Sequence, residues 1–393
     1  MILAKRLFAA MFFARLAGAL FAEDPFLLHT EPFTVVSSRE RAFGGPHTTM
    51  GGGIFLLFSN PASLAYIQQN TLLGMELTLE DVDRLSELID IANVMPYTKA
   101  YLQSRAELGL SVMPPSFKLA GPLIIGVAGK SMAIGFFSRF YTSSTFTFSE
   151  IIPIPIAPVE YDLAVHRVNI NSDFIVSGGI SWNIKNTPSY NLDLGIAAKL
   201  CYRGAEELLS QQTAIAHEAD RVVLETGDIS SRNILGLSLD SGLLFSYMDR
   251  LLIGLTLNDA PAPLIVMNSG EFESLPAFCM ALPHVNLGIA VNIFYTQPVV
   301  CTLAVDFRDA LAVFGLTGTP RNALLNLSAG LEVTVYHLVK LRAGFADLLP
   351  SGGIGMDLGA VSINFALYGA EYGINPGDMS VLCGSVGFIM FLK

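Results

Sequence analysis

The sequence predicts an all-β protein: a transmembrane antiparallel β-barrel of about 14 strands with an N-terminal hatch, or plug, in its lumen. Three observations point to this class. Hydrophobic residues make up 52% of the 393 residues and charged residues only 15%, whereas soluble domains carry about 25% charged residues. Past the N-terminus, no stretch matches the roughly 20 consecutive apolar residues of a membrane-spanning helix. From about Asp162 onward, apolar residues alternate with polar or small ones, as in strands that face lipid on one side.

Residues 1–22 are predicted to be an export signal that is cleaved. Lys5 and Arg6 precede an apolar stretch at 7–20, and small residues near its end offer cleavage positions. Because Arg15 interrupts the stretch, an uncleaved N-terminal helix is the alternative. The whole chain has a formal net charge of −11, and loss of this basic segment makes it more acidic. Nucleic acid is therefore not an expected partner, since phosphate binding needs basic patches.

Residues 70–393 are predicted to form the barrel wall. In the segment 235–247, for example, Leu235, Leu237 and Leu239 alternate with Gly236, Ser238 and Asp240. Successive strand side chains point to opposite faces, so each such segment has one apolar and one polar or small face. Charged residues on the second face are expected to line the lumen and to pair with each other or with the hatch: Asp193, Lys199, Arg203, Asp240, Glu332, Lys340 and Arg342.

Two stretches lack the two-residue period and are predicted to be helical insertions in the wall, near residues 79–93 and 205–222. In the first, Leu79, Val82 and Leu85 share one helical face, opposite acidic residues. Irregular backbone exposed to lipid is too costly, so both insertions are expected in loops or inside the lumen.

Residues 23–69 are predicted to be the hatch. The segment is rich in glycine, as at 51–53, and is too irregular for a wall strand. Its candidate motif is Asn60, Pro61 and Ala62, for which a plain turn before the first wall strand is the alternative.

Arg39 and Arg41 in the hatch are candidate contacts for a ligand carboxylate, because a guanidinium group binds a carboxylate with two parallel hydrogen bonds. The alternative is that these arginines hold the hatch to acidic residues of the lumen.

Motifs for catalysis or metal binding are weak. Residues 126–131 (Gly-Val-Ala-Gly-Lys-Ser) end like a phosphate loop, but Ile124 stands where that motif requires glycine. The six histidines lack the spacing of a zinc site, and no Gly-x-Ser-x-Gly nucleophile motif lies near a candidate base. We therefore expect no enzyme activity, no catalytic residue, no metal site and no cofactor. The pairing of the four cysteines cannot be read from their spacing; the alternative is that they are small strand residues: Cys201, Cys279, Cys301 and Cys383.

The triplet Asn60-Pro61-Ala62, with Ser63, Leu64 and Ala65 after it, resembles a motif of the FadL-type outer-membrane long-chain fatty-acid transporters. Further patches resemble the closing strands of this superfamily, and of its spirochaete members in particular: 326–332, 341–345, 351–357 and 361–370. The resemblance implies a 14-stranded barrel whose N-terminal hatch contains the triplet. The chain departs from the usual terminal Phe of such barrels, since it ends in Lys393, and the family's ligand-binding residues find no match.

The resemblance also implies a function, passive uptake of hydrophobic molecules across the bacterial outer membrane, with long-chain fatty acids as the expected ligands. Expected partners are these small molecules, outer-membrane lipid and the barrel-assembly machinery during biogenesis. Two alternatives stay open. A structural, surface-exposed or protein-shuttling barrel without a transport role would have a solidly packed plug, whereas a transporter would have an apolar pocket. A general water-filled porin is disfavoured by the hatch segment.

Overall fold

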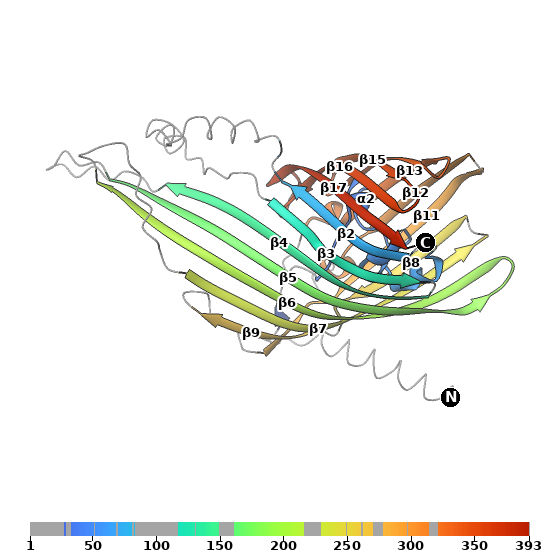
Figure 1. The fold of residues 1–393 in the computed structure, drawn as a ribbon, viewed down its shortest axis with the longest axis horizontal. Helices are drawn as coiled ribbons and strands as arrows, with labels where there is room; N and C mark the ends of the chain where they lie inside the picture. Colours follow the sequence, from blue (N-terminus) through green and yellow to red (C-terminus); the bar gives the residue numbers. More distant parts are fainter. Residues whose placement is uncertain are drawn as a thin grey trace.

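The computed structural model describes residues 27–28, 33–50, 52–67, 70–80, 82, 117–129, 131–148, 161–215, 229–248, 250–260, 262–269, 278–296, 298–313 and 321–392. Within these ranges, fourteen strands form a closed antiparallel barrel (Figure 1). In order around the ring they are β2 (Asn70–Leu79), β3 (Phe117–Gly129), β4 (Met132–Phe148), β5 (Tyr161–Asn186), β6 (Tyr190–Ile215), β7 (Ile229–Tyr247), β8 (Leu251–Asn258), β11 (His284–Thr296), β12 (Val299–Phe307), β13 (Leu327–Val335), β14 (Val339–Ala346), β15 (Leu349–Asp357), β16 (Val361–Glu371) and β17 (Ser380–Leu392).

The ring closes where the last strand meets the first. β17 pairs with β2 from Gly384 opposite Leu79 to Leu392 opposite Asn70. Strand pairing therefore runs all the way around the ring and leaves no open edge, as a barrel in lipid requires. The predicted all-β barrel and its strand number are confirmed.

The outer surface of the wall is apolar. Leu237 in β7, Ile289 in β11 and Leu367 in β16 are each about half exposed, at 52%, 50% and 52%. Their chain neighbours point inward and are buried, as Ser238 is at 1%. This is the alternation expected of a wall with lipid outside, and it makes the barrel a transmembrane one. None of the described helices is long and apolar enough to cross a membrane.

β5 and β6 are the longest strands, with 26 residues each, and extend beyond the other strands of the wall (Figure 1). The helix expected at 205–222 is wrong over 205–215, which continue β6. Ala205, for example, lies opposite Asn171 of β5 and Arg232 of β7. Alanine, glutamate, leucine and glutamine favour helices in isolation, but a strand ladder on each side overrides that preference.

Residues 216–222 of that expected helix lie outside the described residues. The other expected helix, at 79–93, starts on the last residue of β2. Its residues from 83 onward also lie outside the described residues, as does the export signal at 1–22.

Beside β7 the wall changes its strand partner. β7 pairs with β8 over 241–247 and with a separate strand, β9 (Pro263–Ser269), over 231–236. β9 pairs in turn with β10 (Phe278–Ala281), and β10 with the short parallel strand β1 (Leu27–Leu28). Between β8 and β9, the Ala260 N–H donates to the Leu239 carbonyl at 2.9 Å and bridges this change of partner.

The segment 33–67, which belongs to the predicted hatch at 23–69 and is called the hatch below, lies inside the barrel against the inner wall. It contains four short helical turns: α2 (Ser38–Ala42), η1 (Gly53–Phe55), α3 (Leu56–Ser59) and η2 (Pro61–Tyr66). A capping box between Ser37 and Glu40 starts α2. Asn60 caps η2 and is followed by Pro61, which suits a first helical position because it lacks the N–H that would go unpaired there. Two further turns, α6 (Ala310–Val313) and η4 (Ala323–Asn326), lie between β12 and β13.

Candidate functional site

Among the described residues, the inner wall carries four glycine pairs, in each of which two glycines lie directly opposite each other on neighbouring strands. They are Gly126–Gly135 in β3 and β4, Gly195–Gly242 in β6 and β7, Gly254–Gly288 in β8 and β11, and Gly330–Gly344 in β13 and β14. At every one of these positions an added Cβ atom would overlap a hatch atom or the neighbouring backbone. The missing side chains therefore let the hatch lie directly on the wall.

The predicted motif lies on the second of these pairs. A Cβ atom at Gly195 would overlap the backbone of Pro61 and Ala62, and one at Gly242 would overlap the side-chain amide of Asn60. Asn60 is fully buried, at 0% exposure. The structure thus brings Asn60, Pro61 and Ala62 together against the junction of β6 and β7.

The Asn60 side chain uses its amide oxygen and both amide hydrogens. Its oxygen accepts from the Ala62 N–H at 3.0 Å, which caps η2. Its nitrogen donates to the Thr48 carbonyl at 2.7 Å and to the Leu243 carbonyl of β7 at 3.3 Å. One residue therefore joins two turns of the hatch to each other and to the wall, and a buried amide left unpaired here would cost about 1–3 kcal/mol.

The lower half of the hatch, residues 54–64, is held by an apolar cluster. Ile54, Leu57 and Leu64 are fully buried and share this cluster with wall residues of β3–β5 and β9: Ile124, Phe137, Ile175 and Leu264. The rings of Phe58 and Phe137 meet edge to face, with centroids 4.7 Å apart. Burial of each Leu, Ile or Phe side chain stabilises this arrangement by about 1.5–3 kcal/mol.

The upper half, residues 37–50, is held by polar contacts to the opposite side of the wall. The Arg39 guanidinium binds the Glu332 carboxylate of β13 with two hydrogen bonds, at 3.0 and 3.2 Å. The same carboxylate accepts from Arg342 of β14 at 2.6 Å. The Ser38 N–H donates to Glu76 of β2 at 2.8 Å. Of the two predicted ligand contacts, Arg39 thus holds the hatch to a lumenal acid.

Arg41 points to a different strand. Its guanidinium hydrogen-bonds the Tyr368 hydroxyl of β16 and lies 5.1 Å from the centre of that ring. The structure therefore does not bring Arg39 and Arg41 together as one carboxylate site. Arg39 contacts β13, whereas Arg41 contacts β16.

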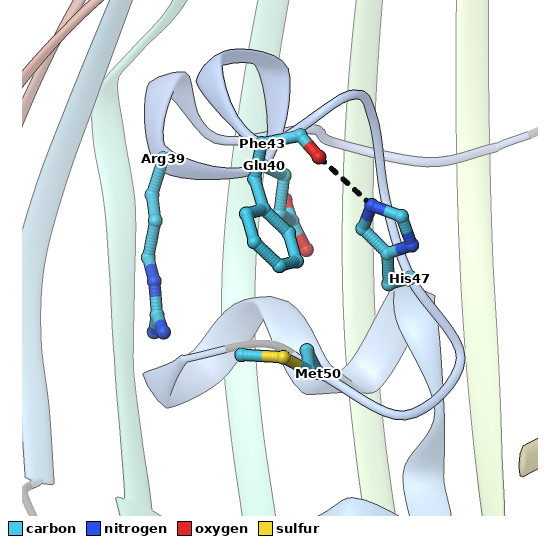
Figure 2. A pocket seen from close by; sticks show the side chains of 5 residues that line it. All are labelled: Arg39, Glu40, Phe43, His47 and Met50. Atoms are coloured by element: carbon cyan, nitrogen blue, oxygen red, sulfur yellow. Dashed lines mark hydrogen bonds between the residues drawn. The ribbon is translucent and has the colours of Figure 1, made fainter. Parts of the chain in front are cut away.

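His47 and Thr48 fix the hatch to β12. His47 Nδ1 lies 2.9 Å from one oxygen of Asp306, and the Thr48 N–H donates to the other at 2.6 Å. His47 Nε2 lies 2.9 Å from the Phe43 carbonyl (Figure 2). The side chains of His47 and Asp306 are almost completely buried, at 1% and 0% exposure.

The pKa values of several titratable hatch residues are shifted, among them those of Arg39, Glu40 and Tyr66. The Glu332 carboxylate raises the pKa of Arg39, so this ion pair stays charged at ordinary pH. Burial raises the pKa of Glu40, against the opposing effect of its hydrogen bonds from Ser37. Burial and a hydrogen bond to Asp193 raise the pKa of Tyr66 to about 12, so Tyr66 donates to that wall carboxylate.

A small cavity lies inside the upper hatch, lined by Arg39, Glu40, Phe43, His47 and Met50 (Figure 2). A water-sized sphere finds only about 10 Å³ of space in it, about what a single water molecule needs. This cavity therefore has no room for a ligand. No cluster of three or more His, Cys, Asp or Glu side chains in that part is arranged to hold a metal.

Sequence reasoning found the inward charges and considered Arg39 as a hatch partner for lumenal acids, which its contact with Glu332 bears out. Lys199 pairs with Asp240 at 2.9 Å and Arg342 with Glu332 at 2.6 Å, which confirms that these charges line the lumen. No pattern in the sequence marks the His47–Asp306 contact or the glycine pairs. Alternation marks Asp306 as an inward position, but its partner lies 259 residues away.

Comparison with known proteins gave matches only among solved structures. No family model matches the chain, and no curated protein does. It is similar to the toluene transporter TodX of Pseudomonas putida, with 12% identity and a TM-score of 0.47 over 92% of this chain and 100% of that chain. The toluene transporter TbuX of Ralstonia pickettii gives 11% and 0.42, over 91% and 98%.

A Pseudomonas aeruginosa FadL homologue gives 10% identity and a TM-score of 0.38, over 92% of this chain and 98% of that chain. A FadL homologue is thus among the solved structures that the chain resembles. The sequence also resembles the FadL-type transporters, through the triplet Asn60-Pro61-Ala62. At these identities and scores the likeness adds nothing to the strand pairings, which establish the barrel by themselves.

Proposed function

We propose that the chain is a bacterial outer-membrane channel for hydrophobic molecules, shown here with its hatch closed. The observation that carries this proposal is the apolar inner wall beneath the lower hatch. Ile124, Phe137 and Ile175 point into the lumen and are fully buried. The lumen of a water-filled porin is polar, so a route opened along these strands suits an apolar solute better than an ion.

The mechanism follows from that wall. A hydrophobic molecule enters from outside, displaces the hatch and gains about 0.8 kcal/mol for each CH₂ group that it buries. No cofactor and no energy coupling are needed for such passive movement. We propose long-chain fatty acids as the ligands, on the resemblance at Asn60–Ala65 alone, which is an argument by analogy.

The carboxylate of such a ligand would reach Arg39 only by displacing Glu332, because Glu332 already takes two of its hydrogen bonds. The same exchange at Arg41 would replace a neutral tyrosine hydroxyl. A charged acceptor binds guanidinium more strongly than a neutral one does. Arg41 is therefore our preferred contact for a ligand carboxylate.

The outer-membrane location rests on physical grounds. Closed barrels with an apolar exterior are the spanning form of bacterial outer membranes, and the predicted export signal at 1–22 supplies the route there.

A structural or interaction barrel is the second candidate, and the small size of the cavity favours it. The cavity beside Met50 offers only about 10 Å³ to a water-sized sphere, so the hatch as it stands has no room for a ligand. The two candidates differ in whether the hatch ever moves.

Uptake by whole cells tests the proposal. A Gram-negative host that lacks its own fatty-acid transporter would produce the chain, and uptake of a long-chain fatty acid, a monoaromatic hydrocarbon and a sugar would be compared with host cells that lack the chain. We expect uptake of at least one hydrophobic solute to rise severalfold while sugar uptake stays level. Unchanged uptake of both hydrophobic solutes, with the barrel present in the outer membrane, would leave the structural role.

A further inference from the structure

The two halves of the hatch rest on different parts of the wall. The main contacts of the upper half go to β2, β12, β13 and β16: Ser38 to Glu76, Arg39 to Glu332, Arg41 to Tyr368, and Thr48 to Asp306. Those of the lower half go to β3–β8: Ile54 to Gly126 and Gly135, Leu57 to Gly179, Ala62 to Gly195, Asn60 to Gly242, and the Phe58 carbonyl to Asn258. The division falls between Met50 and Ile54.

Gly52 and Gly53 form the joint between the two halves. Gly52 is extended, with φ −148° and ψ 135°, and Gly53 has φ +60°, in the left-handed region that glycine adopts without strain. Neither carries a side chain that a change of backbone direction must carry along. Across the joint, the Asn60 side chain donates to the Thr48 carbonyl at 2.7 Å, a hydrogen bond between neutral groups.

We infer that the hatch consists of two bodies jointed at Gly52 and Gly53, and that a hydrophobic solute displaces the lower half from the wall while the upper half stays in place. The role of the solute rests on the proposed function. The division of the hatch does not.

The lower half is held by contacts that an apolar solute can replace. Ile54, Leu57 and Leu64 are fully buried in an apolar cluster. Apolar burial is non-directional and depends on the area removed from water, so a solute that takes their place restores what their departure costs. The hydrogen bonds from this half to the wall join neutral groups, such as the Ser131 N–H and the Leu64 carbonyl at 3.0 Å.

The upper half is held by contacts that a hydrocarbon cannot replace. Arg39 and Arg342 share the buried Glu332 carboxylate, at 3.0 and 2.6 Å. Pulling Arg39 away removes a charged partner from a buried ion pair, which is strongly unfavourable. The N–H groups of Ser38 and Thr48 donate to carboxylates at 2.8 and 2.6 Å, and such charge-assisted hydrogen bonds are about twice as strong as neutral ones. A hydrophobic solute offers neither charge nor acceptor in return.

Displacement of the lower half uncovers a strip of small residues on the inner wall. Ala128, Ala133, Gly179 and Ala197 lie side by side across β3–β6, and Leu57 covers Gly179 in the closed state. Because these residues project little into the lumen, the space that Leu57 leaves is open to an apolar chain or ring. The route of the solute therefore runs between the lower half and β3–β6.

Hydrogen exchange of the purified barrel, followed by mass spectrometry, tests the division without any solute. In Gly242→Ala the added Cβ atom overlaps the Asn60 side chain. The N–H groups of Asn60 and Ser63, bonded within their own short turns, should then exchange at least about tenfold faster, because turns this short do not hold away from the wall. Those of Phe43 and Gly45, in the upper half, should keep their native rates.

Gly330→Ala is the mirror variant, since its Cβ atom overlaps the Phe43 carbonyl. It should speed exchange in the upper half and leave the lower half at the native rate. Gly178→Ala, with its nearest atoms 3.8 Å away, should match the native protein in both halves. If Gly242→Ala does not fold, Leu57→Ala removes a lower-half contact without adding bulk and should give the same pattern. Faster exchange in both halves of a folded single variant would overturn the division.

Oleate and toluene, each added to the native protein, test which half the solute displaces. With at least one of them, exchange at Asn60 and Ser63 should rise about tenfold while Phe43 and Gly45 stay at their native rates. Faster exchange in the upper half would overturn the inference, and so would unchanged exchange in a protein that does take up the solute in cells. Unchanged exchange together with no uptake would overturn the proposed function alone, and the variants then decide the division.

Discussion

Gly195 of β6 and Gly242 of β7 lie directly opposite each other, and the Asn60–Ala62 turn occupies the space that their side chains would fill. The wall is therefore shaped for this turn at two positions 47 residues apart. A plain turn ahead of the first strand would need no such space. The contact between the Asn60–Ala62 turn and the wall is therefore seen in the structure and does not depend on the resemblance to a known family.

A methyl group at Gly242 should therefore expel the turn. Gly242→Ala places a Cβ atom against the Asn60 amide, and overpacking of this kind costs about 1–3 kcal/mol. We expect a barrel that still folds but leaks small dyes. Dye release from vesicles measures the leak, and the shift in gel mobility on boiling shows that the barrel has formed.

Gly178→Ala is the matched control. Gly178 lies in β5, where the nearest atoms to an added Cβ are 3.8 Å away. This variant should remain as tight as the native protein. Equal tightness of the Gly242 variant would mean that the motif does not depend on its fit to the wall.

Asn60→Ala and Asn60→Asp separate two roles of one side chain. Alanine loses the cap on Ala62 and both donor bonds, to Thr48 and Leu243. Aspartate keeps the cap but loses both donors, and places a carboxylate against two carbonyl oxygens. We expect each variant to lower the free energy of unfolding by about 1–3 kcal/mol, with aspartate the worse, measured by urea titration in detergent. A better-tolerated aspartate would show that the cap matters more than the contact with the wall.

The fold could be predicted from the sequence because a two-residue period is local. The alternation from Leu235 to Asp240 indicates which side of β7 faces lipid, and the same alternation recurs in the other wall strands. The 205–215 segment was misread because its helix-forming composition outweighed a weak period, and its pairing with β5 and β7 is visible only in three dimensions.

The site was predictable only in part. Asn60 was found through a motif, and Arg39 was considered as a contact to lumenal acids. The glycine pairs were hidden, because Gly254 and Gly288 become neighbours only through the register of β8 on β11. The same holds for His47 and Asp306, which no local pattern connects.

The ion pair between Arg39 and Glu332 should show strong coupling. Glu332 also binds Arg342, so Glu332→Gln leaves two guanidinium groups facing a neutral amide. Arg39→Gln removes only one cation, and Glu332 keeps its ion pair with Arg342. Removing one partner of a buried pair costs about 3–5 kcal/mol. We expect Glu332→Gln to lower the free energy of unfolding more than Arg39→Gln does. A double-mutant cycle from urea titrations measures the coupling. Additive effects of the two substitutions would contradict it.

Lys199 should stabilise the wall where β7 changes its strand partner. Its ammonium lies 2.9 Å from Asp240 and 2.7 Å from Asp259, which sits between β8 and β9. Lys199→Met leaves two carboxylates buried together and should lower the temperature at which the folded gel band disappears. Adding Asp240→Asn should restore part of that loss by removing one charge. A double variant no more stable than Lys199→Met would show that repulsion between the acids is not the cause.

Removal of the hatch tests the central claim most directly. In a variant without residues 23–69, every hydrogen bond between wall strands is retained, because β2 begins at Asn70. We predict that this variant still assembles as a barrel whose gel mobility shifts on boiling. In planar bilayers it should conduct ions steadily where the native protein is closed. A variant that folds and stays closed, or one that fails to form a barrel at all, would contradict the assignment of this segment as the hatch of a closed channel.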